Sequence, residues 1–133
     1  MKRLYIYLLF ALIALAGCKK NDDIVKDPLH KKWFLHKIER NYTDKDGNPH
    51  TGFESWSQVV DDREMYFEFT NQGQMFTHEG NGTYTKTQTE ISYSLPAVTG
   101  SFNYSFQGDM LVLTTIEEGV TYTQRATFWM KPF

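Results

Sequence analysis

The sequence predicts an all-β protein, an antiparallel, about eight-stranded up-and-down barrel. Apolar and polar residues alternate with a period of two along most of the chain, as in strands with one buried face. The 21 aromatic residues stand among many threonines and serines, which suit the two faces of such strands. Glycine- and asparagine-containing turns separate the apolar runs. Eight consecutive antiparallel strands favour a barrel, and a β-sandwich is the alternative.

Length and composition exclude several classes of protein. A chain of 133 residues has room for one domain and an N-terminal targeting segment. Fourteen basic against 16 acidic residues exclude a dedicated nucleic-acid-binding protein, which would carry a basic surplus. One cysteine excludes an intrachain disulfide framework and a cysteine-based zinc site. An apolar fraction of 41% is too high for a disordered chain.

The first 17 residues have the pattern of a signal peptide. A short basic segment precedes an apolar run over 4–15, which is shorter than the roughly 20 residues of a spanning helix. The run ends in Leu15-Ala16-Gly17-Cys18, which resembles the bacterial lipobox, where the cysteine sulfur receives a diacylglycerol and the chain is cut before it. The resemblance implies a lipid anchor at Cys18, with palmitate among its acyl chains, and attachment to the outer membrane on its periplasmic or cell-surface face. A cleaved secretory signal with an incidental cysteine is the alternative.

The mature chain is expected to consist of a tether over residues 18–28 and one domain over 29–133. The tether is polar, lacks periodicity and ends in Pro28. Loss of residues 1–17 removes Lys2 and Arg3 and no acidic residue, which leaves 12 basic against 16 acidic residues.

The expected strands follow one another with short turns. The clearest is 100–107, in which Phe102, Tyr104 and Phe106 share one face. Turns are predicted at 71–73, 107–109 and 117–119 because each contains glycine, which accepts a positive φ. The predicted strands are 31–41, 64–70, 74–79, 83–87, 90–95, 100–107, 110–116 and 120–130.

The connection over 42–63 is too long for a bare loop in a compact domain. Thr51 and Glu54 fit a capping box, and Phe53, Trp56 and Val60 recur at helical spacing. The sequence therefore predicts one short amphipathic helix here, which would plug one end of the barrel or serve as a mobile lid.

No catalytic, cofactor-binding or metal-binding residue is predicted, and we do not expect an enzyme. The segment 44–48 has oxygen ligands at calcium-loop spacing, but Pro49 and Ser55 replace the required glycine and bidentate glutamate. The four histidines form no ligand pair of metal-site spacing. Adjacent acidic residues stand in turns or in the tether, where they diverge and cannot share a reacting bond.

Trp33 in the first strand, the hairpin over 67–76 and the hairpin over 100–113 resemble the bacterial lipocalin-like lipoproteins. The resemblance covers roughly residues 29–131 and implies a barrel fold more than a ligand. Lys31 stands where classical lipocalins have the glycine of Gly-x-Trp. Arg125 is the candidate for their late arginine over the tryptophan, although its parity places it on the face opposite the apolar residues.

The expected function is a membrane-anchored binding lipoprotein that holds a small hydrophobic or amphipathic ligand in its barrel. Four inward phenols are the candidate ligand contacts, because a buried hydroxyl needs a partner: Tyr84, Tyr93, Tyr104 and Tyr122. The alternative is that these tyrosine rings fill the barrel interior and place their hydroxyls at the rims of the barrel, with no ligand. The alternative function is an envelope protein-interaction or inhibitor module without an internal ligand. Expected partners are thus the membrane through the lipid, a small apolar ligand or an envelope protein, with no nucleic acid.

Overall fold

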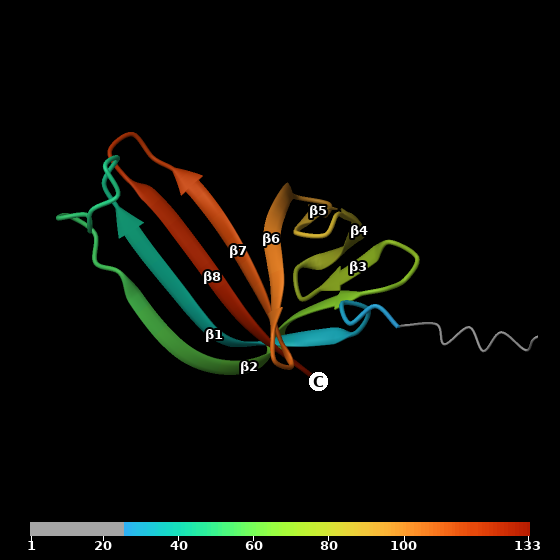
Figure 1. Ribbon diagram of the computed structural model, residues 1–133. Coiled ribbons are helices and arrows are strands. Elements are labelled where there is room, and N and C mark those ends of the chain that lie inside the picture. The colour runs from blue at the N-terminus through green and yellow to red at the C-terminus, as the bar shows by residue number, and fades with distance from the viewer. Residues whose placement is uncertain (1–25) are drawn as a thin grey trace, which may run out of the picture.

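The computed structural model describes residues 26–133, which form a closed antiparallel barrel of eight strands (Figure 1). Each strand pairs with the next along the chain, and the last pairs with the first. The predicted all-β barrel is confirmed, and the sandwich alternative is wrong. The strands are β1 (Lys32–Thr43), β2 (Trp56–Phe69), β3 (Gln74–Thr77), β4 (Gly80–Lys86), β5 (Glu90–Ser94), β6 (Thr99–Gln107), β7 (Met110–Glu118) and β8 (Thr123–Pro132). Cys18 and the signal peptide lie outside the described residues.

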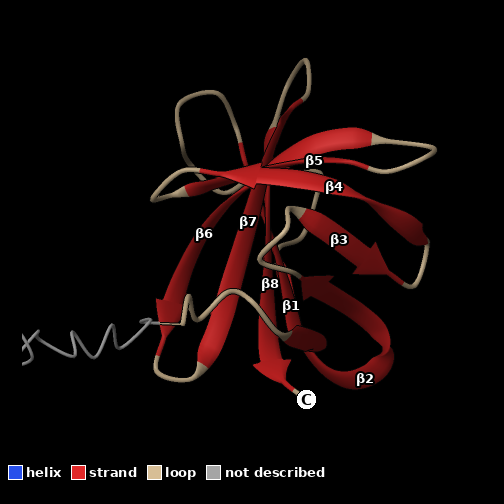
Figure 2. Cartoon of the chain, turned by 90° about the vertical axis from the view of Figure 1, so that its right-hand side faces the viewer, coloured by secondary structure: helices blue, strands red, loops and turns tan. Residues whose placement is uncertain are grey.

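The predicted helix in 42–63 is wrong, because residues 42–43 belong to β1, residues 56–63 belong to β2, and the segment between them consists of turns, bends and one isolated bridge from Pro49 to Thr43 (Figure 2). The capping box does not form. The backbone N–H groups of Gly52 and Phe53 donate instead to Nδ1 of His50, at 2.9 and 3.1 Å. Trp56 and Val60 then continue as strand, paired to β1. No helix of the described chain is long and apolar enough to cross a membrane.

The interior of the barrel is filled by large apolar side chains from all eight strands. The predicted alternation of β6 is confirmed, since Phe102 is buried and Tyr104 and Phe106 pack against the core. Leu29 closes one end from the segment before β1, and its carbonyl accepts a hydrogen bond from the Trp33 indole at 3.1 Å. The largest fully buried side chains are Trp33, Phe69, Leu29, Met75, Ile91, Leu111, Leu113 and Met130.

The barrel is closed only over part of its height. β2 pairs with β3 through residues 67–69 alone, and β6 pairs with β7 only from Asn103 to Gln107. Over this part, which we call the closed ring, all eight strands are joined. Beyond it β2, β1, β8 and β7 continue side by side as a four-stranded open sheet that rises away from β3–β6 (Figure 1). The open sheet comprises residues 37–43, 56–60, 115–118 and 123–128.

Two matched irregularities lie where the closed ring passes into the open sheet. His36 has no register partner in either neighbouring strand. Across from it, Asp61 is the one non-glycine residue of the described chain with a positive φ, at 48°. His36 Nδ1 and Asp61 Oδ1 are 2.5 Å apart, so the imidazole N–H donates to the carboxylate. Bulges of this kind bend a strand and increase its local twist, which here turns β1 and β2 out of the ring.

The burial pattern of β7 predicts a large difference between two of its aliphatic side chains. Leu113 is completely buried, whereas Ile116 on the open sheet is half exposed. Leu113→Ala should lower the free energy of unfolding by about 2–5 kcal/mol, because it leaves a cavity in a packed core. Ile116→Ala should lower it by less than about 1 kcal/mol. Urea denaturation measures both, and equal losses would contradict the assignment of the core to the closed ring.

Candidate functional site

Two of the predicted contact tyrosines have their hydroxyls bonded to backbone carbonyls. Tyr84 on β4 is buried against Phe69, and its hydroxyl donates to the carbonyl of Thr70 at 2.7 Å. Burial, together with the nearby Asp27 carboxylate, raises the pKa of Tyr84. Tyr104 on β6 donates to the carbonyl of Thr87 at 3.0 Å. Both hydroxyls are thus satisfied by turns and do not require a ligand as partner.

The other two predicted contact residues lie apart from each other. Tyr93 on β5 stacks on Phe102, with ring centroids 5.0 Å apart, and covers Gly100 on β6 so closely that a Cβ there would come within 2.6 Å of the Tyr93 hydroxyl. Tyr122 lies in the turn between β7 and β8, at the far end of the open sheet. Tyr84, Tyr93 and Tyr104 therefore belong to the strands of the closed ring, and Tyr122 does not join them.

The tip of the open sheet carries an aromatic cluster that tethers the two long loops. Phe53 packs on Tyr122 with ring centroids 5.1 Å apart, and on Tyr42 at 5.3 Å. His50 lies 4.9 Å from Phe53. Beside the cluster, Lys45 binds Glu118 at 2.7 Å, which lowers the pKa of that carboxyl. These contacts fix the segment before β2 to the turn between β7 and β8.

The face of the open sheet that continues the barrel interior combines aromatic, cationic and amide side chains. Register places Arg40 of β1 opposite both Trp56 and Ala126. The Arg40 guanidinium lies 5.8 Å from the centre of the Trp56 ring, and its Nε is buried without a hydrogen-bond partner in the described chain. Gln58 and Gln124 flank this pair on the same face. No prediction from the sequence singled out this surface.

Exposed apolar side chains gather on β2 and the segment that leads into it. Nine large apolar residues of the described chain are exposed, and five of them fall within residues 53–65. Trp56 is 41% and Val59 58% exposed. In the sequence, these exposed residues could have been recognised from residues 56–60, Trp-Ser-Gln-Val-Val, which are uncharged and place apolar side chains on both faces of a strand. The five residues are Phe53, Trp56, Val59, Val60 and Met65.

The barrel interior leaves little free space. An apolar pocket of about 40 Å³ lies where β2 leaves β3, and His78 borders it from the β3–β4 turn. The wider hollow bordered by Asp27, His30 and Glu68 lies outside the barrel, where the described chain begins. The apolar pocket is lined by Leu35, Met65, Phe67, Phe128 and Met130, together with Tyr66 and His78.

The calcium-like segment is a turn. The Asp44 carboxylate accepts hydrogen bonds from the backbone N–H groups of Asp46 and Asn48, at 3.0 and 2.8 Å, which lowers the pKa of Asp44. Within residues 26–133, no three histidine, cysteine or acidic side chains gather as a metal site would require.

The cation over the Trp33 ring is Lys31, whose Nζ lies 5.1 Å from the ring centre. Arg125 instead stands on the open sheet, exposed and opposite Asn41 and Ile116. The expected contact between Arg125 and Trp33 does not form, and Lys31 contacts the Trp33 ring in its place.

Comparison with protein-family models, with curated proteins and with solved structures finds no match to this chain.

An ion pair fastens the beginning of the described chain to the closed ring. Lys86 at the end of β4 binds the Asp27 carboxylate, which also accepts the N–H of Leu29 at 3.0 Å. Partial burial alone would raise the pKa of Asp27, but these two hydrogen bonds outweigh it and the net pKa is lowered. The pKa of Lys86 is raised mainly by its hydrogen bond to Asp27.

Asp27→Asn should destabilise the protein at neutral pH and not at low pH. The folded-state pKa of Asp27 lies below its ordinary 3.8, so the pair stabilises above that pH and its contribution is lost as pH falls through the folded pKa. At the alkaline end, the contribution is lost only as pH rises through the raised pKa of Lys86, above 10.5. Between about pH 5 and pH 9 the Asp27–Lys86 pair is intact, and the deficit should be at most about 1 kcal/mol. A deficit in urea denaturation that persists at about pH 2 would contradict this reasoning.

Proposed function

We propose that the protein is a lipid-anchored barrel of the bacterial outer membrane that binds another envelope protein through its open sheet. The observation that carries this proposal is the distribution of apolar side chains. The closed ring is filled by large apolar side chains and has an apolar pocket of about 40 Å³. By contrast, Trp56, Val59 and Val60 are exposed on the β2 edge of the open sheet, and the exposed Phe53 and Met65 lie before and after them in the sequence. An exposed apolar concentration of this kind is typical of an interaction site.

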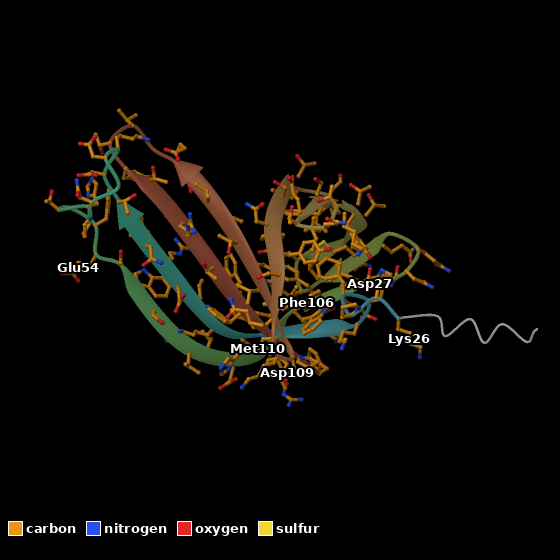
Figure 3. All side chains as sticks on the ribbon, in the orientation of Figure 1. Lys26, Asp27, Glu54, Phe106, Asp109 and Met110 are labelled. Atoms are coloured by element: carbon orange, nitrogen blue, oxygen red, sulfur yellow. The ribbon has the colours of Figure 1, made fainter. Side chains whose placement is uncertain are left out.

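The attachment point supports this assignment. The chain reaches the domain at Lys26, beside the closed ring, and Glu54 lies at the opposite side of the molecule (Figure 3). A lipid on Cys18 would therefore hold the closed ring near the membrane and leave the open sheet directed away from it. Stable attachment requires more than one acyl chain, as the lipobox resemblance implies.

Labelled palmitate should enter the wild-type protein and not Cys18→Ser, because the cysteine sulfur and the amine that its cleavage exposes are the acylated groups. Protease treatment of intact cells then separates the two faces of the outer membrane. Digestion in intact cells indicates the surface face, and digestion only after lysis indicates the periplasmic face. Equal labelling of Cys18→Ser would contradict the anchor.

A small amphipathic ligand is the second candidate, and the apolar pocket between β2 and β3 favours it. Met65 is exposed at this pocket, and Leu35 and Phe128 line its inner side. The pocket is smaller than a ligand of several carbon atoms, so binding would require β2 to move away from β3 over 61–66, where no ladder joins them. Such a ligand would meet Met65 and Phe67 first.

Crosslinking in intact cells and a fluorescent apolar probe distinguish these two functions. An interaction module should be captured with one stoichiometric protein, and its melting temperature should not respond to the probe. A ligand-binding barrel should bind the probe at micromolar concentration, and Met65→Ala, at the apolar pocket, should change the affinity more than the outward Asn103→Ala. Probe binding without protein capture would overturn the interaction function in favour of the ligand.

A further inference from the structure

We propose that the free edge of β2 at 56–60 binds an extended segment of the partner protein as an added antiparallel strand, and that this segment is apolar at alternate positions and basic at both ends. The inference rests on the proposed function, because it describes the partner's binding segment.

The backbone of this edge has unused hydrogen-bonding groups. From Trp56 onward β2 is paired to β1, but it is joined to β3 only at residues 67–69. No loop backbone within residues 26–133 bonds to 56–66. The N–H and C=O groups that point away from β1 therefore form a row open to another strand. Main-chain bonds along such an edge are how strand addition gains its affinity.

The side chains along the edge suit an apolar partner strand. Trp56 faces the same side of the sheet as Arg40, and Val59 faces the other side, opposite Lys37. Val59 and Val60 are β-branched and exposed, and a strand laid beside them would cover them with its own side chains. Cross-strand pairs of aromatic and β-branched residues are favourable, so alternating valine or isoleucine in the partner fits the face that carries Trp56.

Acidic residues bound the edge at both ends. Glu54 precedes it and points away from the sheet (Figure 3). Asp61, Asp62 and Glu64 follow it, and the irregularity at Asp61, with its positive φ, interrupts the regular pairing of β2 with β1. Asp61 is already paired with His36 and Lys131 and is also close enough to feel the charge of Arg63, whose guanidinium lies over the rings of Phe34 and Phe133. Asp62 and Glu64 form no ion pair within residues 26–133, so they carry the free negative charge at this end. Basic residues at the ends of the partner segment complete this charge pattern.

The same charges argue against a second copy of this chain as the occupant. An antiparallel pair of two β2 edges centred on Gln58 would place Glu54 of each copy opposite Asp62 of the other. Like charges directly opposite one another destabilise a strand pair. A foreign segment with basic ends has no such conflict.

The other free edge of the open sheet lacks these features. Residues 115–118 of β7 pair only with β8 and include Glu117 and Glu118. Glu118 is bound to Lys45 and accepts the Thr123 hydroxyl at 2.8 Å. Charged side chains on an edge strand protect it from pairing. The uncharged β2 edge is therefore the binding edge.

The test uses the full chain in detergent and a labelled peptide, Lys-Lys-Thr-Val-Thr-Val-Thr-Lys-Lys, followed by fluorescence anisotropy. The peptide should bind, and replacing its central threonine by proline should abolish binding because proline cannot donate to the ladder. A peptide with glutamates in place of the lysines should not bind. Val60→Lys should weaken binding at least about tenfold, while Val120→Lys, at an exposed valine in the β7–β8 turn, should change it less than about twofold.

Three outcomes would overturn the inference: no binding of the basic peptide, equal binding of the proline peptide, or equal weakening by Val60→Lys and Val120→Lys. A dimer in sedimentation that Val60→Lys dissolves would assign the edge to a second copy and overturn the choice of occupant. Val59→Lys replaces Val60→Lys if melting curves show that the latter does not fold. Failure of the peptide with continued capture of one protein in cells would reject this edge and leave the proposed function standing.

Discussion

The contact between His36 and Asp61 marks the constraint on which the shape of this barrel depends. Continuous pairing of the eight strands would satisfy the backbone hydrogen-bonding groups of the ring. β1 and β2 nevertheless each contain an irregularity, and the two irregularities lie opposite each other. The Asp61 backbone takes a left-handed conformation, which is unfavourable for a residue other than glycine. The carboxylate, which also lies 3.9 Å from Lys131, receives the His36 N–H, and this bond lowers its pKa. His36 of β1 thus holds Asp61 of β2 in its left-handed conformation, at the point where both strands bend.

The bend divides the molecule into two parts with different energetic roles. The closed ring contains the packed core, with Trp33, Leu111 and Met130 nearly or completely buried. Within residues 26–133 no second layer covers the inner face of the open sheet, and the sheet is ordered by its neighbouring strands and by the aromatic cluster at its tip. Ala126 differs from most residues of the open sheet because its side chain is buried, opposite Arg40 of β1. Stability therefore resides in the ring, and the open sheet is a supported extension of it.

The alternation of Phe102, Tyr104 and Phe106 was sufficient to predict β6, and the glycines at 73 and 108 were sufficient to predict two turns, because both signals are local. The segment around Phe53 and Trp56 could not be predicted in the same way. Its helical spacing competed with strand pairing to β1, and pairing with residues 16–22 positions away has no local signature. The four tyrosines were chosen as inward phenols in need of partners. The carbonyls of Thr70 and Thr87, which satisfy two of them, come from turns that only the folded chain brings near.

The exposed run at 56–60 is held in place at both of its ends. Below it the bulge at Asp61 joins β2 to β1 through His36, and above it Phe53 is packed on Tyr42 and Tyr122. The hydroxyl of Ser55 also accepts the backbone N–H of Tyr42 at 3.0 Å. A strand fixed in this way loses little conformational entropy when something binds to it. Its apolar exposure is therefore a property of an ordered surface, supported by the ring, and does not arise from a frayed end of the sheet.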